Sequence, residues 1–502
     1  MSPPVPGDAP ANLPATVGAL RASGHRYRTV KDEIRENLLA RMRSGEARFP
    51  GVVGFDETVL PDLERALLAG HDVVLLGERG QGKTRLMRTI VGLLDAWTPV
   101  IAGVELHEHP YHPITPAGRR RAAELGDDLP VAWVHRDDRY AEKLATPDTS
   151  VGDLIGDVDP IKVAEGRTLG DPETIHFGLV PRTHRGIFAV NELPDLAERI
   201  QVSLLNVLEE RDVQVRGYVL RLPLDVLLVA SANPEDYTNR GRIITPLKDR
   251  FGAEIRTHYP LDVDVEVDLV RQEAQLVAEV PDHLVEMTAR FTRAVRESPA
   301  VDSRSGVSAR FAIAAAETLA AAALRRAALL GELADGAGDR RGAVARIGDA
   351  ETVPATLRGK VEFEADGEGR EVEILDHLLR RSVAETWRSR LGGLDLGGFV
   401  RLVENGHGIS TGDRVPSGEL LEQVGRVSGL AQVLARLGFD EVPTPAEAAS
   451  AVEFVLEGLH LTRRLAKDVL DDGRVIYGAG DPPAGPGRRD DDEGRRWRRR
   501  DR

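Results

Sequence analysis

Short apolar runs alternate with segments of helical period through the first half of the chain. Three runs have the length and composition of buried strands: residues 72–76, 186–190 and 225–230. Three segments place apolar residues at helical spacing: 30–45, 83–94 and 196–210. A weaker turn signal predicts a hairpin over 213–224. Strands that alternate with helices predict a parallel sheet in an α/β fold.

After Pro260 the pattern becomes mainly helical. The helical periods cover 265–277, 282–297, 308–333, 375–391, 418–437 and 444–470. Residues 336–354 interrupt them as a linker or insert, and residues 360–375 alternate as a strand pair around the turn Asp366-Gly367. The second half is therefore predicted to be a helical region with an insert near 336–375.

The length of 502 residues is too great for one core and indicates two or three domains. We expect a disordered lead over 1–29 and an α/β core over 30–260. A helical region over 261–475 and a disordered charged tail over 476–502 complete the expected organisation.

Composition and charge exclude several classes of protein. The chain has no cysteine, which excludes disulfides and thiolate metal sites and fits a reducing compartment. No stretch is apolar and long enough to cross a bilayer, and the first residues lack the pattern of a signal peptide. The net charge of −15 argues against a nucleic-acid-binding surface along the whole chain but does not exclude a local basic patch in the pore of a ring. We therefore expect a cytoplasmic protein that binds neither membranes nor nucleic acid.

One motif carries the strongest chemical signal. Residues 77–84 match the phosphate-binding pattern G-x-x-x-x-G-K-[ST] in full, between a predicted strand and a predicted helix. Glycines let backbone N–H groups approach phosphate oxygens, Lys83 faces the β- and γ-phosphates, and Thr84 offers a hydroxyl to Mg²⁺. The sequence thus predicts ATP and Mg²⁺ as ligands. The predicted contacts are Gly77, Glu78, Arg79, Gly80, Gln81, Gly82, Lys83 and Thr84.

The apolar strand 186–190 is followed by Asn191 and Glu192. In P-loop enzymes this position usually holds an Asp for Mg²⁺ and a Glu that polarises the attacking water. Glu192 is predicted to be that base, the alternative being that it only caps the next helix. Asn191 keeps an oxygen for Mg²⁺ but lacks the charge, so we expect weaker metal binding and slow basal hydrolysis.

Two further polar residues follow the third strand. Asn233 stands at its tip, where it would orient the attacking water, although Asn-Pro is also a plain turn signal. Arg250 would reach the γ-phosphate of a neighbouring subunit as an arginine finger. The alternative for Arg250 is a surface ion pair with Asp249 or Glu254.

These motifs, in this order, resemble the AAA+ family, and within it the ATPase subunit of magnesium chelatase and the MoxR ATPases. The resemblance covers residues 48–260 and, beyond them, only Gly306–Arg310. The supporting stretches are Phe49–Gly54, Val151–Asp159 with Glu165–Arg167, Gly178–Pro181, Leu204–Glu209, Ala232–Glu235 and Asp249–Gly252.

The resemblance implies a P-loop AAA+ core, a parallel sheet in an αβα sandwich, followed by a mainly α-helical lid. It implies that Val52 and Val53 lie in the adenine-contacting segment. It also implies that Asn233 is sensor 1, Arg250 the finger and Arg310 sensor 2. Such proteins form homo-oligomeric rings, most often hexamers, and often act with a partner that carries a von Willebrand A-type domain. That partner would be a separate chain, because no D-x-S-x-S motif is present.

Three functions stay open at this point. The first is an ATP-driven motor that remodels a partner protein or drives metal insertion. The second is an ATP-dependent transcription activator, although its usual Gly-Ala-Phe-Thr-Gly-Ala loop and helix-turn-helix are not evident. The third is an ATP-binding scaffold with little hydrolysis, suggested by Asn191. The segment 107–112 holds metal-ligand residue types, but Pro110 prevents a helix that would align them, so a polar surface insert is predicted instead.

Overall fold

The chain divides into two compact units, with the boundary between Leu261 and Asp262. Within the described residues, no helix is both long and apolar enough to cross a membrane. The computed structural model describes residues 9–479 except 160, 162–163, 165–173, 211–212, 216–217, 221, 235–241, 303–305, 334–341, 407, 441 and 471–472.

The first unit is built on a sheet of five parallel strands in the order β11-β1-β10-β7-β4. Three of these strands were predicted from their apolar runs, and the two edge strands, β4 and β11, were not. The bounds are β1 Val73–Leu76, β4 Tyr140–Leu144, β7 Gly186–Asn191, β10 Val226–Ala232 and β11 Ala253–Arg256.

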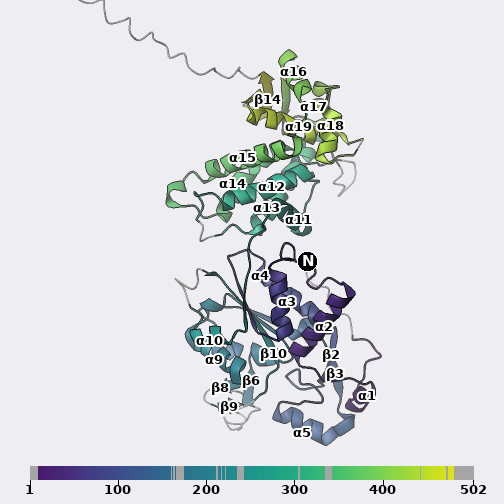
Figure 1. Cartoon of the computed structure of the whole chain (residues 1–502), viewed down its shortest axis with the longest axis vertical. Helices are drawn as coiled ribbons and strands as arrows, with labels where there is room; N and C mark the ends of the chain where they lie inside the picture. Colours follow the sequence, from purple (N-terminus) through teal and green to yellow (C-terminus); the bar gives the residue numbers. More distant parts are fainter. Residues whose placement is uncertain are drawn as a thin grey trace, which may run out of the picture. The chain divides into compact units, whose positions relative to one another are not determined.

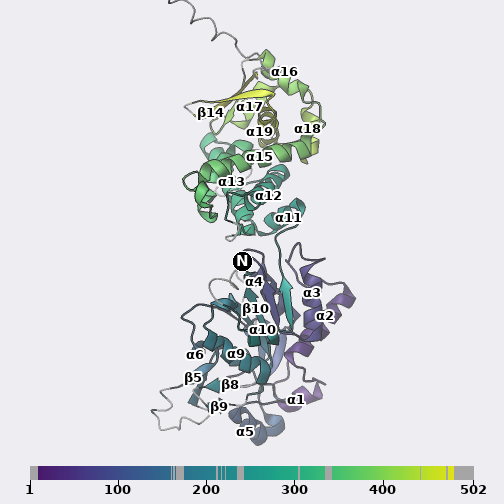
Figure 2. The same cartoon turned by 60° about the vertical axis from the view of Figure 1, so that its left-hand side comes forward.

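Helices cover both faces of this sheet, so the unit is an αβα sandwich (Figures 1 and 2). Successive strand residues point to opposite faces, which explains why the central strands are apolar throughout. Val73 and Leu75 belong to the core under α2, α3 and α4, whereas Val74 and Leu76 belong to the core under α9 and α10. The bounds are α2 Val30–Ser44, α3 Val59–Ala69, α4 Lys83–Thr89, α9 Glu198–Glu210 and α10 Thr245–Arg250.

Smaller elements surround the sandwich. The predicted lead over 1–29 is wrong in part, because Thr16 caps a short helix α1 and pairs with Pro130. The predicted helix over 83–94 ends as α4 at Thr89 and continues as a 3₁₀ turn. The remaining bounds are α1 Val17–Ala22, β2 Trp97–Ile101, α5 Pro116–Leu125, β3 Val131–His135, α6 Val151–Leu154, β5 Gly156–Val158, β6 Ile175–Phe177, α8 Leu179–Arg182, β8 Val213–Val215 and β9 Tyr218–Leu220.

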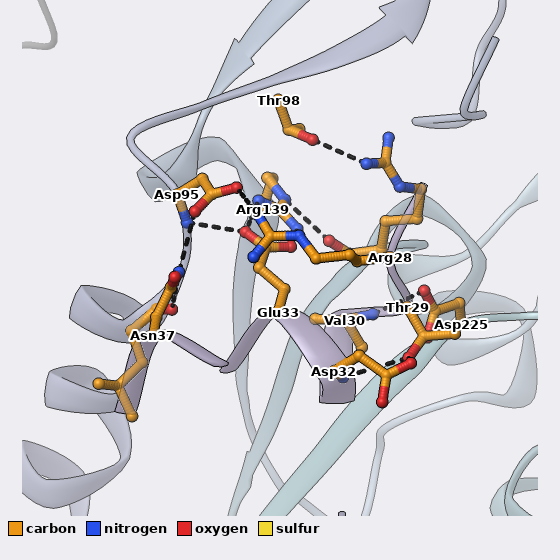
Figure 3. A network of polar contacts seen from close by, with 12 residues as sticks. Arg28, Thr29, Val30, Asp32, Glu33, Asn37, Asp95, Thr98, Arg139 and Asp225 are labelled. Carbon is orange, nitrogen blue, oxygen red and sulfur yellow. Dashed lines mark hydrogen bonds and ion pairs between the residues drawn. The ribbon is translucent and has the colours of Figure 1, made fainter. Parts of the chain in front are cut away.

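A buried polar network ties α2 to the amino-terminal ends of the strands (Figure 3). The guanidinium of Arg139, just before β4, donates to both carboxylate oxygens of Glu33 on α2, at 2.8 and 2.7 Å. Its Nε donates to the carbonyl of Arg185, just before β7, at 2.8 Å. Asp225, just before β10, accepts from the backbone N–H of Val30. The network therefore holds three strands in place at the edge opposite their carboxyl ends.

Two buried histidines accompany this network. Burial, and next the charge of Arg185, lower the pKa of His109 to about 2 and that of His184 to about 3. The ring of His184 accepts a hydrogen bond from the backbone N–H of Asp225, which requires an unprotonated nitrogen.

Acid is expected to destabilise the first unit through these rings. The unfolded chain binds protons with the ordinary pKa of about 6.5, but the folded unit excludes them until about pH 3. Stability is therefore complete above pH 6.5 and falls below it, by on the order of 2 kcal/mol per histidine at pH 5. Urea unfolding at pH 7 and pH 5 should show this loss, and His184→Asn should reduce it. An unchanged pH dependence in that variant would contradict the assignment.

The second unit is mainly helical, as predicted. Its central helices α12 and α13 pack together through rings such as Phe291 and Phe311, whose centroids lie 5.4 Å apart. The helices are α11 Val263–Glu273, α12 Asp282–Arg296, α13 Ala309–Leu330, α14 Val353–Leu357, α15 Glu371–Leu391, α16 Gly397–Asn405, α17 Ser417–Val424, α18 Leu430–Leu437 and α19 Pro445–Leu461.

Several predictions for this unit are wrong. No strand pair forms over 360–375: Phe363 makes one isolated bridge with Val301, and Asp366-Gly367 lies in a 3₁₀ turn. The helix predicted over 418–437 is two helices, because Gly425 and Gly429 adopt positive φ between them.

The helix predicted over 444–470 ends at Leu461, and a strand follows. That strand belongs to a small antiparallel sheet, β12-β14-β13, which was not predicted. Its bounds are β12 Ile409–Gly412, β13 Leu465–Val469 and β14 Arg474–Ala479. The tail from 480 lies outside the described residues.

Candidate functional site

The P-loop connects the end of β1 to the start of α4 at the carboxyl edge of the sheet. Gly80 and Gly82 have φ of 76° and 74°, a backbone conformation that side chains disfavour. A Cβ on Gly77 would lie 2.0 Å from the hydroxyl of Thr257. Glycine is therefore required at these three positions of the motif for steric reasons.

Side chains that the motif pattern leaves free hold the loop in shape. The Gln81 side-chain oxygen accepts from the backbone N–H of Glu78 at 3.0 Å and from the Thr257 hydroxyl at 2.9 Å. The Tyr259 hydroxyl donates to the carbonyl of Arg79 at 2.9 Å. Thr257 and Tyr259 contact the loop from the segment after β11. Because this edge strand was not predicted, neither residue could be identified from the sequence.

Lys83 is buried, and its ammonium group lies inside the loop. Nζ donates to the carbonyls of Gly77 and Glu78, the latter at 2.8 Å, and to Oδ1 of Asn233 at 2.8 Å. Asn233 follows β10 directly, so its side chain joins the P-loop to the neighbouring strand. This contact places the predicted sensor beside the predicted phosphate-binding cation.

Glu192 follows β7 and faces Asn233. Nδ2 of Asn233 donates to Oε2 of Glu192 at 2.8 Å, and the Glu192 backbone N–H donates to the Ser231 hydroxyl at 3.2 Å. Glu192 has φ 56° and ψ 49°, a left-handed conformation that is uncommon outside glycine and is often found at functional sites. Its side chain makes no capping hydrogen bond to the 3₁₀ turn that follows, and its role as the base stays a prediction.

Asn191 lies between the P-loop helix and the edge strand. Its Oδ1 accepts from the hydroxyls of Thr84 at 3.1 Å and Ser231 at 3.3 Å. Its Nδ2 donates to Oε1 of Glu142 at 2.6 Å. Glu142 belongs to β4, which pairs with β7 in parallel, and it was not among the predicted site residues.

Glu142 is also held by Arg88 of α4 and by Tyr140. The Arg88 guanidinium donates to both carboxylate oxygens at 2.7 and 2.9 Å, and the Tyr140 hydroxyl donates at 3.0 Å. Burial raises the pKa of Glu142, but hydrogen bonds from Arg88, Tyr140 and Asn191, with the Arg88 charge, hold it below its ordinary value. Glu142 is therefore a carboxylate at neutral pH.

The residues at this edge fit a nucleotide with Mg²⁺. The glycine loop leaves no room for side chains at its base, and the N-terminus of the helix that follows it would favour a bound anion. Lys83 would face the β- and γ-phosphates, while Thr84 and Asn191 would offer neutral oxygens to the metal. Both predicted ligands are oxygen donors, the type that Mg²⁺ prefers, but neither is a carboxylate.

The segment before the P-loop packs against it. A Cβ on Gly51 would lie 2.7 Å from the Arg85 guanidinium of α4, and the Phe55 ring lies 3.8 Å from a Cβ built on Gly82. Val52 and Val53 lie between these two contacts and are partly buried. Their predicted contact with adenine stays a prediction.

The two predicted arginines lie in different units. Arg250 ends α10 and forms an ion pair with Glu209 of α9, so neither Asp249 nor Glu254 is its partner here. Arg310 is the second residue of α13, in the second unit, and is exposed. Their roles as finger and sensor 2 stay predictions. Residues 165–167 and Glu235 lie outside the described residues.

The prediction of a polar surface insert over 107–112 is wrong, because the side chains of Glu108 and His109 are fully buried. The buried carboxylate of Glu108 accepts from the backbone N–H groups of Ile114 and Thr115 and from the Thr115 hydroxyl. His109 accepts from the backbone N–H of Tyr111. In the part of the chain that the structure describes, no group of three or more His, Cys, Asp or Glu residues could hold a metal ion.

The sheet order β11-β1-β10-β7-β4, a P-loop after β1 and a glutamate after β7 define the P-loop fold of the AAA+ class. The fold predicted from the sequence is therefore confirmed. Within this class, the chain is similar to subunits of magnesium chelatase, as the motifs indicated. No protein-family model matches the chain.

Two relatives show the extent of this similarity. The magnesium-chelatase 38 kDa subunit of Acidiphilium rubrum is 30% identical over 214 residues, which cover 40% of this chain and 55% of that protein. The chloroplastic magnesium-chelatase subunit ChlI-1 of Arabidopsis thaliana is 28% identical over 238 residues, 45% of this chain and 51% of that protein. The chain thus spans about half the length of these relatives.

Solved structures add no functional argument. The Holliday junction branch migration motor RuvB of Thermotoga maritima is 14% identical, with 89% of this chain and 90% of that chain covered. Its TM-score of 0.32 is too low to support a comparison of sites.

Proposed function

We propose that the first unit binds ATP with Mg²⁺ and hydrolyses the nucleotide. The proposal rests on two hydrogen bonds. Lys83 of the P-loop donates to Asn233, and Asn233 donates to Glu192. They bring a buried cation, an amide and a carboxylate from three strand ends to one edge of the sheet. Phosphoryl transfer to water depends on positioned groups of these types.

Each side chain has a distinct task in this proposal. Lys83 binds the β- and γ-phosphates, and Thr84 and Asn191 hold the metal. Bound Mg²⁺ would neutralise phosphate charge. Glu192 accepts a proton from the attacking water, and Asn233 keeps the Glu192 carboxylate in place through its 2.8 Å hydrogen bond.

Nucleotide binding is expected to depend on Lys83. Lys83→Ala removes a buried cation that would face phosphate oxygens, so the affinity should fall about tenfold or more. Titration of a fluorescent ATP analogue measures it. The matched control is Lys360→Ala, which removes an exposed lysine of the second unit. Equal affinity for Lys83→Ala and the control would contradict the proposal.

The proposal includes a homo-oligomeric ring, a hexamer, in which Arg250 completes the site of a neighbour. The Arg250 side chain is 43% exposed at the end of α10, and its exposed ion pair with Glu209 would have to break. Arg250→Ala and Glu192→Gln should each be inactive alone. Mixed together they should regain part of the turnover, because some interfaces combine an intact base with an intact finger. If Arg250→Ala alone hydrolyses ATP at the full rate, Arg250 is not the arginine finger.

For the work done by the motor, we propose remodelling of a partner protein or metal insertion. The similarity to magnesium-chelatase subunits over about half of their length supports this choice. A separate chain with a von Willebrand A-type domain is the proposed partner. The second candidate is an ATP-binding scaffold with little hydrolysis, which the neutral Asn191 favours. A steady-state ATPase assay with and without the partner separates the two.

A further inference from the structure

The carboxylate of Glu142 lies beside the residue in the magnesium position. Its Oε1 is 2.6 Å from Nδ2 of Asn191, and its side chain is 19% exposed. Glu142 and Asn191 are 49 residues apart in sequence, and the parallel pairing of β4 with β7 brings them together. An acidic side chain is therefore present beside the magnesium position, but it comes from β4 and not from the end of β7, where the usual aspartate would lie.

This acid fixes the orientation of the Asn191 amide. A carboxylate only accepts hydrogen bonds, so the NH₂ group of Asn191 must face Glu142. The Asn191 oxygen then faces the hydroxyls of Thr84 and Ser231, at 3.1 and 3.3 Å. Without Glu142, either end of the amide could face Thr84, and only the oxygen can serve a metal.

We propose that Glu142 supplies the negative charge of the magnesium site and, as a positioning residue, directs the Asn191 oxygen toward Thr84. This inference rests on the proposed ATP–Mg²⁺ site. Asn191 and Glu142 together carry the single negative charge that an aspartate usually provides. An aspartate at position 191 would instead place two carboxylates at hydrogen-bond distance, where they repel.

Arg88 partly neutralises the Glu142 carboxylate and so limits its attraction for a metal ion. It is 62% exposed and contacts both oxygens of Glu142 from the P-loop helix. Loss of Arg88 would leave the Glu142 carboxylate without its cation, so the local field would become more negative. The inference therefore predicts opposite effects on magnesium binding for the two members of this ion pair, whereas a merely structural ion pair predicts the same effect.

The test measures the magnesium gain, the factor by which the Kd of a fluorescent ATP analogue falls when EDTA is replaced by Mg²⁺. E142Q keeps an acceptor for the Asn191 amide but removes the charge, so it should lower the gain about threefold to tenfold. R88Q should raise the gain. E142Q/N191D moves the acid back to the usual strand and should restore the gain to within about twofold of the original chain.

The matched control is E254Q, which removes an acid from the opposite edge strand of the same sheet, and it should leave the gain unchanged. Equal gains for E142Q and E254Q would overturn the inference, as would a parallel fall in E142Q and R88Q. Failure of E142Q/N191D to recover the gain would also overturn it. The proposed function fails separately, if Lys83→Ala leaves ATP affinity unchanged.

Discussion

Glu192→Gln is expected to slow ATP turnover about a hundredfold or more, the usual contribution of a general base. The glutamine side chain has the same shape and can still accept the 2.8 Å hydrogen bond from Asn233. It also tolerates the left-handed backbone as well as glutamate does. Only the capacity to take a proton is lost, so ATP affinity should stay within about threefold.

Single-turnover kinetics separate this effect from binding. The matched control is Glu198→Gln, which changes an exposed glutamate at the start of α9 and should turn over normally. Unaltered turnover in Glu192→Gln would remove Glu192 as the base. If the protein without substitutions already hydrolyses almost no ATP, the result would instead favour an ATP-binding scaffold.

Local patterns predicted the parts of the site that lie next to one another in sequence. The P-loop could be identified because glycines, lysine and threonine stand at fixed spacing between a strand and a helix. Glu192 could be identified because it ends an apolar strand. The structure adds the contacts that link them, since Asn233 reaches both Lys83 and Glu192.

Glu142 could not be found in this way. Its strand, Tyr140–Leu144, is a short edge strand with two charged residues at its centre, neither a long apolar run nor a chemical motif. Its importance comes from strand order: β4 lies beside β7, which brings its carboxylate to Asn191. The order of strands in a sheet depends on contacts between distant segments, which a short window of sequence does not contain.

The same reason explains the errors in the second unit. Residues 465–469 continue an apolar pattern that begins in α19, so local spacing favours a longer helix. Pairing with Arg474–Ala479 and, through it, with Ile409–Gly412 makes that segment a strand. Tertiary pairing therefore overrides the local preference.

Arg139→Gln is expected to destabilise the first unit by about 3–5 kcal/mol, because it leaves the buried Glu33 carboxylate without the guanidinium that is hydrogen-bonded to it. The Arg139 side chain is fully buried, and that of Glu33 is 4% exposed. Burial raises the pKa of Glu33, but the hydrogen bonds and charge of Arg139, with smaller contributions from the Asp95 backbone N–H and the Arg185 charge, hold the pKa below its ordinary value. The variant thus removes the partner that keeps this buried acid ionised.

Calorimetry of the full chain should show one transition lowered by about 10 °C, with the transition of the second unit unchanged. Arg21→Gln breaks an exposed ion pair with Asp127 and should move neither transition by more than about 1 °C.

A second variant, Arg139→Met with Glu33→Leu, replaces both charges and should recover much of the loss, because well-packed apolar pairs substitute for buried ion pairs. If the transition temperature of Arg139→Gln is as high as that of Arg21→Gln, the buried network does not stabilise the first unit. If the double replacement is no better than Arg139→Gln, the loss comes from the Arg139 contact with the Arg185 carbonyl, and not from the unpaired acid.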